Sequence, residues 1–270
     1  MKQNMMKDYF DFRNGRIYYR DHGSGRVILL IHGYLETAEI WSRFAGKLAR
    51  KFRVISVDLP GHGKSDIFGE IHTMEFMATV LRDLIESLGI EKILLTGHSL
   101  GGYVTMAFVD LFPEMLTGYC MFHSHPFNDA EEVVVKRKMD IKIIKRGGKD
   151  KLIPVSITNM FAIPNLQKFS GALQQSIRIA TSIPNEGIIA MLKGMMLRPS
   201  RLSVMEEGRV NCMWILGIMD NYINCELIQT KVRLPANAEV CILNSSGHMG
   251  FIEEEEKSLE ILEDFIDKCY

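Results

Sequence analysis

The segment Gly97-His98-Ser99-Leu100-Gly101 places a serine between two glycines, directly after the apolar run of residues 92–96 and before a helical pattern. A Gly-x-Ser-x-Gly sequence between a strand and a helix is typical of a nucleophile elbow, which lifts the serine hydroxyl above the edge of a sheet. Glycine is needed on both sides because larger side chains would collide with the neighbouring strand and helix. The helix N-terminus beside the serine favours developing negative charge. Ser99 is therefore the candidate nucleophile.

A serine hydroxyl needs a nearby base, and the base needs a group that orients it. Asp220 follows the strand-like run of residues 212–216, and His248 follows the run of residues 239–243. The order serine, aspartate, histidine is the one used by enzymes with this type of elbow. We therefore predict the triad Ser99, Asp220 and His248. Asp129, which follows the strand-like run of residues 116–122, is the alternative acid.

A second local signal lies directly after the buried run of residues 27–31. Gly33 in this position allows the backbone to approach a ligand closely, which makes the backbone N–H of Tyr34 a candidate oxyanion donor. The N–H of Leu100, directly after the nucleophile, is the other predicted donor. The candidate substrate-binding residues lie beside these features and at the start of the insertion described below: His32, Gly33, His98, His123 and His125.

His123 and His125 are two positions apart, so they face the same side of an extended segment and could suggest a metal site. No third ligand has a suitable spacing, and the segment enters the region where pocket-lining residues belong. We expect a pocket wall here, no metal site, and no requirement for a cofactor.

The elements that must position these residues alternate between strands and helices. Strand-like runs cover residues 9–12, 17–21, 27–31, 53–58, 92–96, 116–122, 212–216 and 239–243, and helical patterns cover residues 37–51, 73–88, 100–112 and 255–269. Such alternation predicts an α/β fold with a mostly parallel central sheet flanked by helices. The first two runs are separated by Asn14-Gly15 and form a hairpin that adds antiparallel strands at one edge.

Residues 126–207 interrupt this alternation. They contain amphipathic stretches broken by Pro154, Pro164, Pro184 and Pro199, and no buried strand run. We predict a helical insertion after the sixth strand, with a core formed by residues 1–125 and 208–270. A basic cluster early in the insertion is interpreted as a solvated helix face, with a channel for anionic substrates as the alternative: Lys136, Arg137, Lys138, Lys142, Lys145, Arg146, Lys149 and Lys151.

Composition limits the classes of function. The chain has 270 residues, 47% of them hydrophobic, and a net charge of −1, which argues against nucleic acid or an anionic membrane surface as partner. It lacks a run of roughly 18 apolar residues, and its first residues lack the apolar stretch of a signal peptide. The five cysteines are widely spaced and odd in number, which indicates free thiols in a reducing cytoplasm. We expect a cytoplasmic protein with a small-molecule partner and no membrane partner.

Taken together, the motifs HGYLETAEIW, DLPGHGKSD, GHSLGG, GIMD and GHMGFIEE occur in an order that resembles the α/β-hydrolase fold family over nearly all of the chain outside the insertion. The resemblance implies that Ser99, Asp220 and His248 are nucleophile, acid and base, and that the insertion is a helical cap over the active site. It also implies a serine hydrolase that cleaves a small to medium carboxylic ester through an acyl-enzyme.

Two kinds of alternative stay open. Enzymes with the same triad include C–C bond hydrolases, thioesterases and lyases of the menaquinone-pathway type, and their differences lie in cap residues that the sequence does not place. The other alternative is a ligand-binding or sensing protein that has retained a hydrolase pocket. Turnover of an acyl ester separates the two classes.

Overall fold

The computed structural model describes residues 8–270. Within this range an eight-stranded sheet has the order β1-β2-β4-β3-β5-β6-β7-β8. The strands are β1 (Tyr9–Phe12), β2 (Gly15–His22), β3 (Val27–Ile31), β4 (Arg53–Val57), β5 (Ile93–His98), β6 (Leu116–Phe122), β7 (Asn211–Gly217) and β8 (Ala238–Leu243). β1 pairs antiparallel with β2, and β2 pairs antiparallel with β4, whereas the remaining pairs are parallel. The predicted mostly parallel sheet with an antiparallel hairpin at one edge is confirmed.

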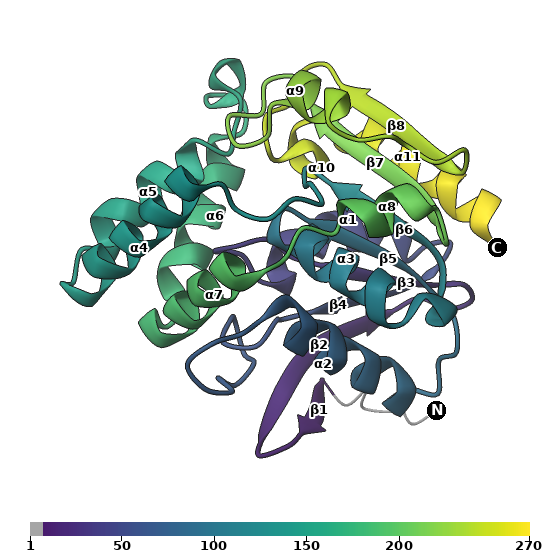
Figure 1. Ribbon diagram of the computed structural model, residues 1–270, viewed down its shortest axis with the longest axis horizontal. Coiled ribbons are helices and arrows are strands. Elements are labelled where there is room, and N and C mark those ends of the chain that lie inside the picture. The colour runs from purple at the N-terminus through teal and green to yellow at the C-terminus, as the bar shows by residue number, and fades with distance from the viewer. Residues whose placement is uncertain (1–7) are drawn as a thin grey trace.

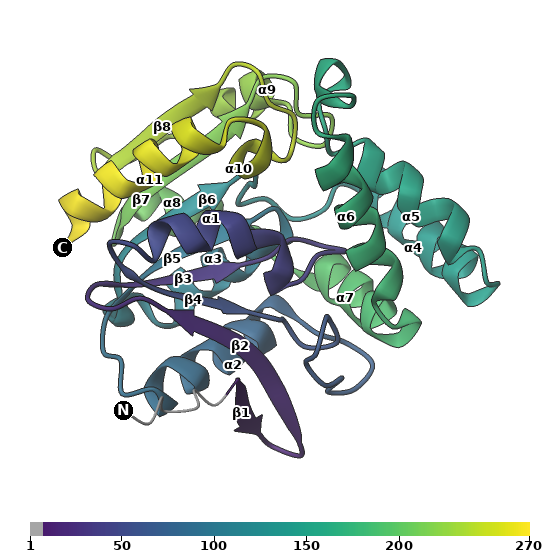
Figure 2. The same ribbon diagram turned by 180° about the vertical axis from the view of Figure 1, so that it is seen from behind.

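Two layers of helices cover the sheet. α2 (Met74–Ser87) and α3 (Leu100–Leu111) lie on one face, and α1 (Ser42–Leu48) and α11 (Glu255–Cys269) lie on the other (Figures 1 and 2). All residues of β3 and β5 are buried between these layers, as their continuous apolar runs predict. The remaining short helices outside the insertion are η1 (Ala38–Trp41), η2 (Pro113–Met115), α9 (Cys225–Thr230) and α10 (Gly250–Glu253).

The segment between β6 and β7 is helical. α4 (Glu131–Lys145), α5 (Lys149–Thr158), η3 (Ile163–Asn165), α6 (Ser170–Ser182) and α7 (Asn185–Leu197) form a group to one side of the sheet (Figure 1), and we refer to α4–α7 as the cap helices. α8 (Leu202–Glu207), although inside residues 126–207, packs against α3 of the core.

The expectation that Pro154 interrupts the insertion is wrong. Pro154 lies inside α5, whereas Pro164 lies in η3, Pro184 is the N-cap of α7 and Pro199 follows the end of α7. Proline removes one backbone donor from a helix, but α5 continues because it packs against α6 and buries Ile153. Tertiary packing outweighs the local preference at this position.

The cysteines, the N-terminal segment and the helices bear on where the protein was expected to be located. The five cysteines are free thiols. The first seven residues, part of the segment expected to lack a signal peptide, lie outside the described residues. Among the helices of residues 8–270, none combines the length and the apolar character needed to cross a membrane.

Candidate active site

The elbow at the end of β5 has the strained backbone that its glycines predict. Ser99 has φ 51° and ψ −113°, and it directly precedes the first residue of α3. A Cβ atom on Gly97 would lie 2.2 Å from the carbonyl oxygen of Gly101, and a Cβ on Gly101 would lie 2.5 Å from the carbonyl oxygen of Ile31. Any larger residue at either glycine would force the strand and helix apart. Ser99 is partly exposed, while the residues on either side of it are buried.

Backbone hydrogen bonds hold this turn in place. The Ser99 amide donates to the carbonyl of Phe122 on β6 at 2.9 Å. The Ser99 carbonyl accepts from the Gly102 amide at 2.9 Å and from the Ser124 hydroxyl at 2.7 Å. The strained conformation is therefore fixed by β6 and α3 rather than by the turn alone.

Asp220, and not Asp129, contacts His248. The distance from His248 Nδ1 to Asp220 Oδ2 is 2.7 Å. Asp129 instead accepts hydrogen bonds from Arg137 Nε at 2.7 Å and from Arg198 Nη1 at 2.7 Å. The geometry thus separates the two candidate acids, because only Asp220 can orient the imidazole of His248.

The Asp220 carboxylate is saturated with donors. Its Oδ1 accepts from the amides of Tyr222 at 2.8 Å and Ile223 at 3.0 Å, and its Oδ2 faces both His248 and His123. Burial alone would raise the pKa of Asp220, but the charge of His248 and the hydrogen bonds from the two histidines outweigh it and hold the pKa well below its usual range. Asp220 is therefore ionised at neutral pH.

His248 is held next to the elbow through its backbone. His98, which precedes Ser99, contacts the carbonyl oxygen of His248 through Nε2 at 2.8 Å. Within the described residues, neither Ser99 Oγ nor His248 Nε2 has a hydrogen-bond partner, so these two atoms are not linked in this geometry. Catalytic hydrogen bonds are often long in structures without substrate and tighten when substrate binds.

Two amides near the elbow are available as oxyanion donors. The N–H of Leu100 is at the start of α3, where no helix carbonyl can accept from it. The N–H of Tyr34 lies in the turn after β3, and residue Leu35 of that turn has φ 63°. Neither amide has a hydrogen-bond partner among the residues of the described chain. Both predicted donors are free to receive a ligand.

His32 and Gly33 support the turn after β3. His32 is fully buried; its Nδ1 contacts the Gly33 carbonyl at 2.8 Å, and its Nε2 accepts from the Leu59 amide at 2.9 Å. Both ring nitrogens are occupied by backbone groups, so the predicted substrate contact through the His32 ring has no free atom. The Gly33 amide is also occupied, because it donates to Glu36 Oε2 at 2.5 Å.

His98 forms a buried pair with Glu36, which was not among the predicted site residues. His98 Nδ1 lies 2.9 Å from Glu36 Oε2, and both side chains are almost fully buried. Each nitrogen of His98 faces an oxygen that only accepts, so the ring is satisfied as an imidazolium. Burial opposes this charge, but Glu36 raises the pKa of His98, and His98 in turn lowers the pKa of Glu36. Both nitrogens of His98 are thus occupied, which leaves none for the predicted substrate contact.

We expect Glu36→Gln to lower the free energy of unfolding by about 2–4 kcal/mol at pH 6, because it leaves the buried imidazolium of His98 without its counter-charge. Because the pKa of Glu36 is lowered, its charge stabilises the folded protein at pH values above the ordinary glutamate pKa of about 4.3. Because the pKa of His98 is raised, its charge stabilises the folded protein fully at pH values below the ordinary histidine pKa of about 6.5. The deficit should therefore shrink as the pH rises through the raised pKa of His98. Denaturant unfolding of both proteins at pH 6 and pH 9 measures this difference.

The exposed Glu39, changed to glutamine, is the matched control and should leave the free energy of unfolding nearly unchanged at both pH values. An equal deficit for Glu36→Gln at pH 6 and pH 9 would contradict a charged Glu36–His98 pair.

His123 is fully buried rather than part of an exposed pocket wall. Its Nδ1 lies 3.3 Å from Asp220 Oδ2, and its Nε2 accepts from the Gly250 amide at 3.2 Å. Together with His248 it forms a cluster whose ligand-type atoms lie within 4.8 Å of one another. Because Gly250 donates to Nε2, the His123 proton is on Nδ1, and a metal ion would have to displace that proton. The cluster is better described as a hydrogen-bond network than as a metal centre.

His125 belongs to a different cluster, under the cap. Its Nε2 contacts the Tyr103 hydroxyl at 3.2 Å, and the guanidinium of Arg198 lies 3.8 Å from the centre of the Tyr103 ring. Arg137 and Arg198 share the single carboxylate of Asp129, so the cluster holds more positive than negative charge. Burial first, and then the charge of Arg198, lower the pKa of His125 to about 3, which keeps this histidine neutral.

Glu253 connects the loop that carries His248 to the segment between α5 and α6. Its Oε2 accepts from the Gly247 amide at 2.8 Å, and its Oε1 accepts from the Ala162 amide at 2.9 Å and from Asn165 Nδ2 at 2.8 Å. The His248 amide also donates to the Met160 carbonyl at 2.7 Å. The position of His248 therefore depends on the segment between α5 and α6, a long-range connection that no periodicity in the sequence reveals.

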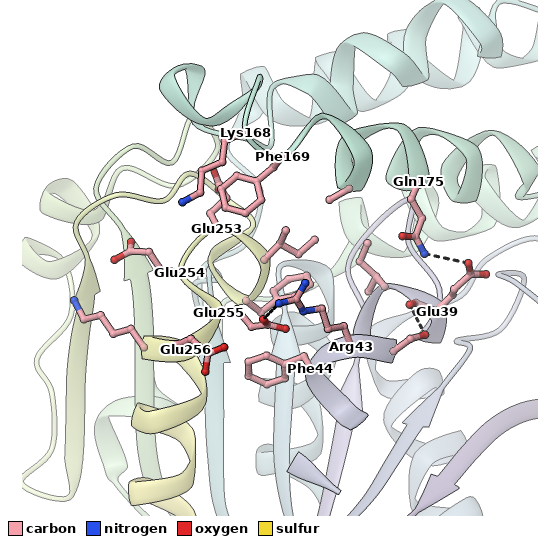
Figure 3. Close-up of a pocket in the computed structure, with 16 residues that line it drawn as sticks. Glu39, Arg43, Phe44, Lys168, Phe169, Gln175, Glu253, Glu254, Glu255 and Glu256 are labelled. Carbon is pink, nitrogen blue, oxygen red and sulfur yellow. Dashed lines mark hydrogen bonds and ion pairs between the residues drawn. The ribbon is translucent and has the colours of Figure 1, made fainter. Parts of the chain in front are cut away.

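A cavity of about 650 Å³ lies beside this connection, between the cap and the core (Figure 3). Lys168 and Phe169 line the cavity on the cap side. On the core side, Arg43 and Glu255 line it and form an ion pair at 2.9 Å. Its lining includes Glu253 but none of the predicted triad residues. This cavity is thus adjacent to the loop that carries His248, and its lining does not include Ser99.

Comparisons with known proteins agree with this architecture. The family described as alpha/beta hydrolase fold matches residues 26–139. An uncharacterised protein of Mycobacterium tuberculosis (strain ATCC 25618 / H37Rv) is 25% identical over 92% of this chain and 77% of that protein. A 2-hydroxy-6-oxononadienedioate/2-hydroxy-6-oxononatrienedioate hydrolase of Paraburkholderia phymatum is 24% identical over 93% of this chain and 91% of that enzyme. The structure of an esterase from Thermogutta terrifontis superposes with a TM-score of 0.90 at 25% identity, covering 94% of each chain.

Proposed function

This chain belongs to the α/β-hydrolase fold family, and we propose that it is a serine hydrolase acting on small to medium carboxylic esters. The observation that carries the proposal is the 2.7 Å contact between His248 and the buried carboxylate of Asp220, beside the strained elbow of Ser99. This arrangement supports a nucleophile, a base and an orienting acid in the roles that acyl transfer requires.

In the proposed reaction, His248 Nε2 accepts the Ser99 proton while Ser99 Oγ attacks the ester carbonyl carbon. The carbonyl π electrons move to oxygen, and the Tyr34 and Leu100 amides stabilise the resulting oxyanion. The tetrahedral intermediate collapses, the C–O bond breaks, and the alcohol leaves with the proton from His248. Water then repeats the sequence on the acyl-enzyme and releases the acid. Asp220 holds Nδ1 of His248 protonated and stabilises the imidazolium in both halves.

The cap helices are proposed to cover the substrate and to exclude water from the reacting carbonyl. The chemistry uses only side chains and backbone amides of this chain. We also propose that the enzyme acts on a small molecule in the cytoplasm, in line with the free cysteines and the near-zero net charge.

One observation favours a second candidate, a C–C bond hydrolase acting on an acidic substrate. Arg137 and Arg198 share the one carboxylate of Asp129, beside His125. Excess positive charge at this place would suit a substrate carboxylate. The relative from Paraburkholderia phymatum is named for the hydrolysis of a dioate. A thioesterase or a sensing protein with a retained pocket has no comparable observation in its favour.

A panel of acyl substrates tests the proposal. We expect turnover of p-nitrophenyl acetate and butyrate, and covalent labelling by a fluorophosphonate. The kcat/KM should rise with pH toward neutrality, because only the neutral ring of His248 can act as base. Absence of both turnover and labelling would favour the sensing protein, and preference for a vinylogous diketone acid over esters would favour the second candidate.

A further inference from the structure

We propose that His123 is a positioning residue that holds the Asp220 carboxylate in the orientation required by His248. The inference rests on the proposed serine hydrolase mechanism and adds a fourth side chain to its hydrogen-bond network. His123 does not touch the reacting atoms; it acts through Asp220.

The contacts of His123 define which of its nitrogens carries the proton. The Gly250 amide can only donate, so Nε2 of His123 accepts, and the proton lies on Nδ1, which faces Asp220 Oδ2 at 3.3 Å. The same oxygen receives the Nδ1–H of His248 at 2.7 Å. Two imidazoles therefore donate to a single carboxylate oxygen, and both side chains are almost completely buried.

These contacts join three segments that are separate in the sequence. His123 follows β6, Asp220 lies in the loop after β7, and Gly250 begins α10 two residues after His248. The His123 amide also donates to the Ile215 carbonyl on β7 at 2.8 Å, which fixes the ring relative to the Asp220 loop. When His248 moves toward Ser99 during the reaction, its own bond to Asp220 is the one that changes. The bond from His123 stays in place and keeps Oδ2 from following.

The backbone of His123 supports a role beyond packing. It has φ 48°, a left-handed conformation that a residue other than glycine or asparagine adopts at a cost of about 1 kcal/mol or more. Such strain persists only where the surroundings hold it, and it gathers at functional sites. The strain turns the ring back toward Asp220 at the point where the chain leaves β6 for the insertion.

The charge state of His123 suits this role. Burial is the main cause that lowers the pKa of His123 to about 4, so the ring is neutral at physiological pH. A neutral N–H donor orients the carboxylate without cancelling the negative charge that stabilises the imidazolium of His248. A cationic residue in the same place would compete with His248 for that charge.

Two substitutions of His123 test whether the N–H donor to Asp220 or the imidazole ring as a whole is needed. Glycine and asparagine both accept the left-handed backbone at this position. His123→Gly removes the donor, and His123→Asn places an amide N–H close to the former position of Nδ1. On p-nitrophenyl butyrate we expect His123→Gly to lower kcat by about 10- to 100-fold, since a hydrogen bond to a charged group is lost, with KM changed less than about twofold. His123→Asn should recover kcat to within about threefold of the wild type.

The pH profile provides a readout that a merely structural role would not move. The titratable groups facing the His248 ring are Asp220 at Nδ1, Tyr222 from the loop after β7, His98 from the end of β5 and His123 itself. Without the His123 donor, the full charge of Asp220 Oδ2 acts on His248. The acid limb of kcat/KM for His123→Gly should therefore move upward by about half a pH unit, and His123→Asn should restore it.

His72→Ala is the matched control for the loss of a buried imidazole. His72 is fully buried and accepts a backbone amide at Nε2, from Phe68 at 3.2 Å, but none of its contacts involves Asp220. It should lose stability comparable to His123→Gly, measured by denaturant unfolding, while keeping the wild-type kcat and acid limb.

Wild-type kcat and acid limb in a folded His123→Gly would overturn the proposal, as would equal losses in His123→Gly and His123→Asn. Ser99→Ala, assayed in parallel, distinguishes failure of the serine mechanism from failure of the proposed role of His123. If Ser99→Ala stays active, the serine mechanism itself fails; if Ser99→Ala is inactive and His123→Gly is unimpaired, only the role of His123 fails.

Discussion

Ser99→Ala should reduce kcat on p-nitrophenyl esters by a factor on the order of 10⁴ or more, because it removes the only proposed nucleophile. KM should change little, since the substrate still meets the same cap and oxyanion donors. Alanine retains the Cβ atom of serine, so the strain at φ 51° is unchanged, and the free energy of unfolding should move by less than about 1 kcal/mol. Steady-state kinetics and denaturant unfolding on the same preparation measure both effects.

Covalent labelling gives an independent result for the same variant. The fluorophosphonate adduct of the wild type should be lost in Ser99→Ala, and peptide mapping of the wild-type adduct should place it on Ser99. Ser87→Ala removes an exposed hydroxyl at the end of α2 and should label and turn over like the wild type. An adduct that persists in Ser99→Ala would show that another residue is the nucleophile.

Asp220→Asn should lower kcat by about 10³- to 10⁴-fold, because it changes which nitrogen of His248 carries the proton. The side-chain oxygen of asparagine would stay with the amides of Tyr222 and Ile223, which can only donate. Its NH₂ group would then face Nδ1 of both His248 and His123. His248 would adopt the tautomer with the proton on Nε2 and could no longer accept the proton of Ser99.

The same substitution should also cost stability at neutral pH. The lowered pKa of Asp220 means that its charge contributes stability that is fully present above the ordinary aspartate value of about 3.9 and is lost only as the pH falls below it. The difference in free energy of unfolding between wild type and Asp220→Asn should thus shrink as the pH falls from about 5 toward 3. Denaturant unfolding across this range is the measurement.

Asp129→Asn is the informative comparison. Asp129 contacts Arg137 and Arg198 and does not contact His248, so its loss should act mainly on KM and far less on kcat. A larger loss of kcat in Asp129→Asn than in Asp220→Asn would show that the acid is drawn from the segment after β6.

The order of strands and helices follows from the sequence because it depends on local properties. Continuous apolar runs predict the buried strands β3 and β5, and the helical pattern of residues 73–88 predicts α2. The elbow is also local: Gly97 and Gly101 are required by atoms that lie within a few ångströms of the same turn and of the adjacent strand. Reactive groups placed at the ends of parallel strands meet at one edge of the sheet, so the pairing of Asp220 with His248 was within reach of sequence reasoning.

Only the tertiary structure decided which carboxylate contacts His248, Asp220 rather than Asp129, and what surrounds each histidine. His98 takes its partners from Glu36, 62 positions away, and from the His248 carbonyl, 150 positions away. His123 was expected to face a substrate, and its partner lies 97 positions along the chain. A histidine has two nitrogens that donate or accept according to their neighbours. Its residue type and spacing therefore predict that it can do chemistry, whereas the contacts made on folding determine whether it binds substrate, carries charge or holds another residue in place.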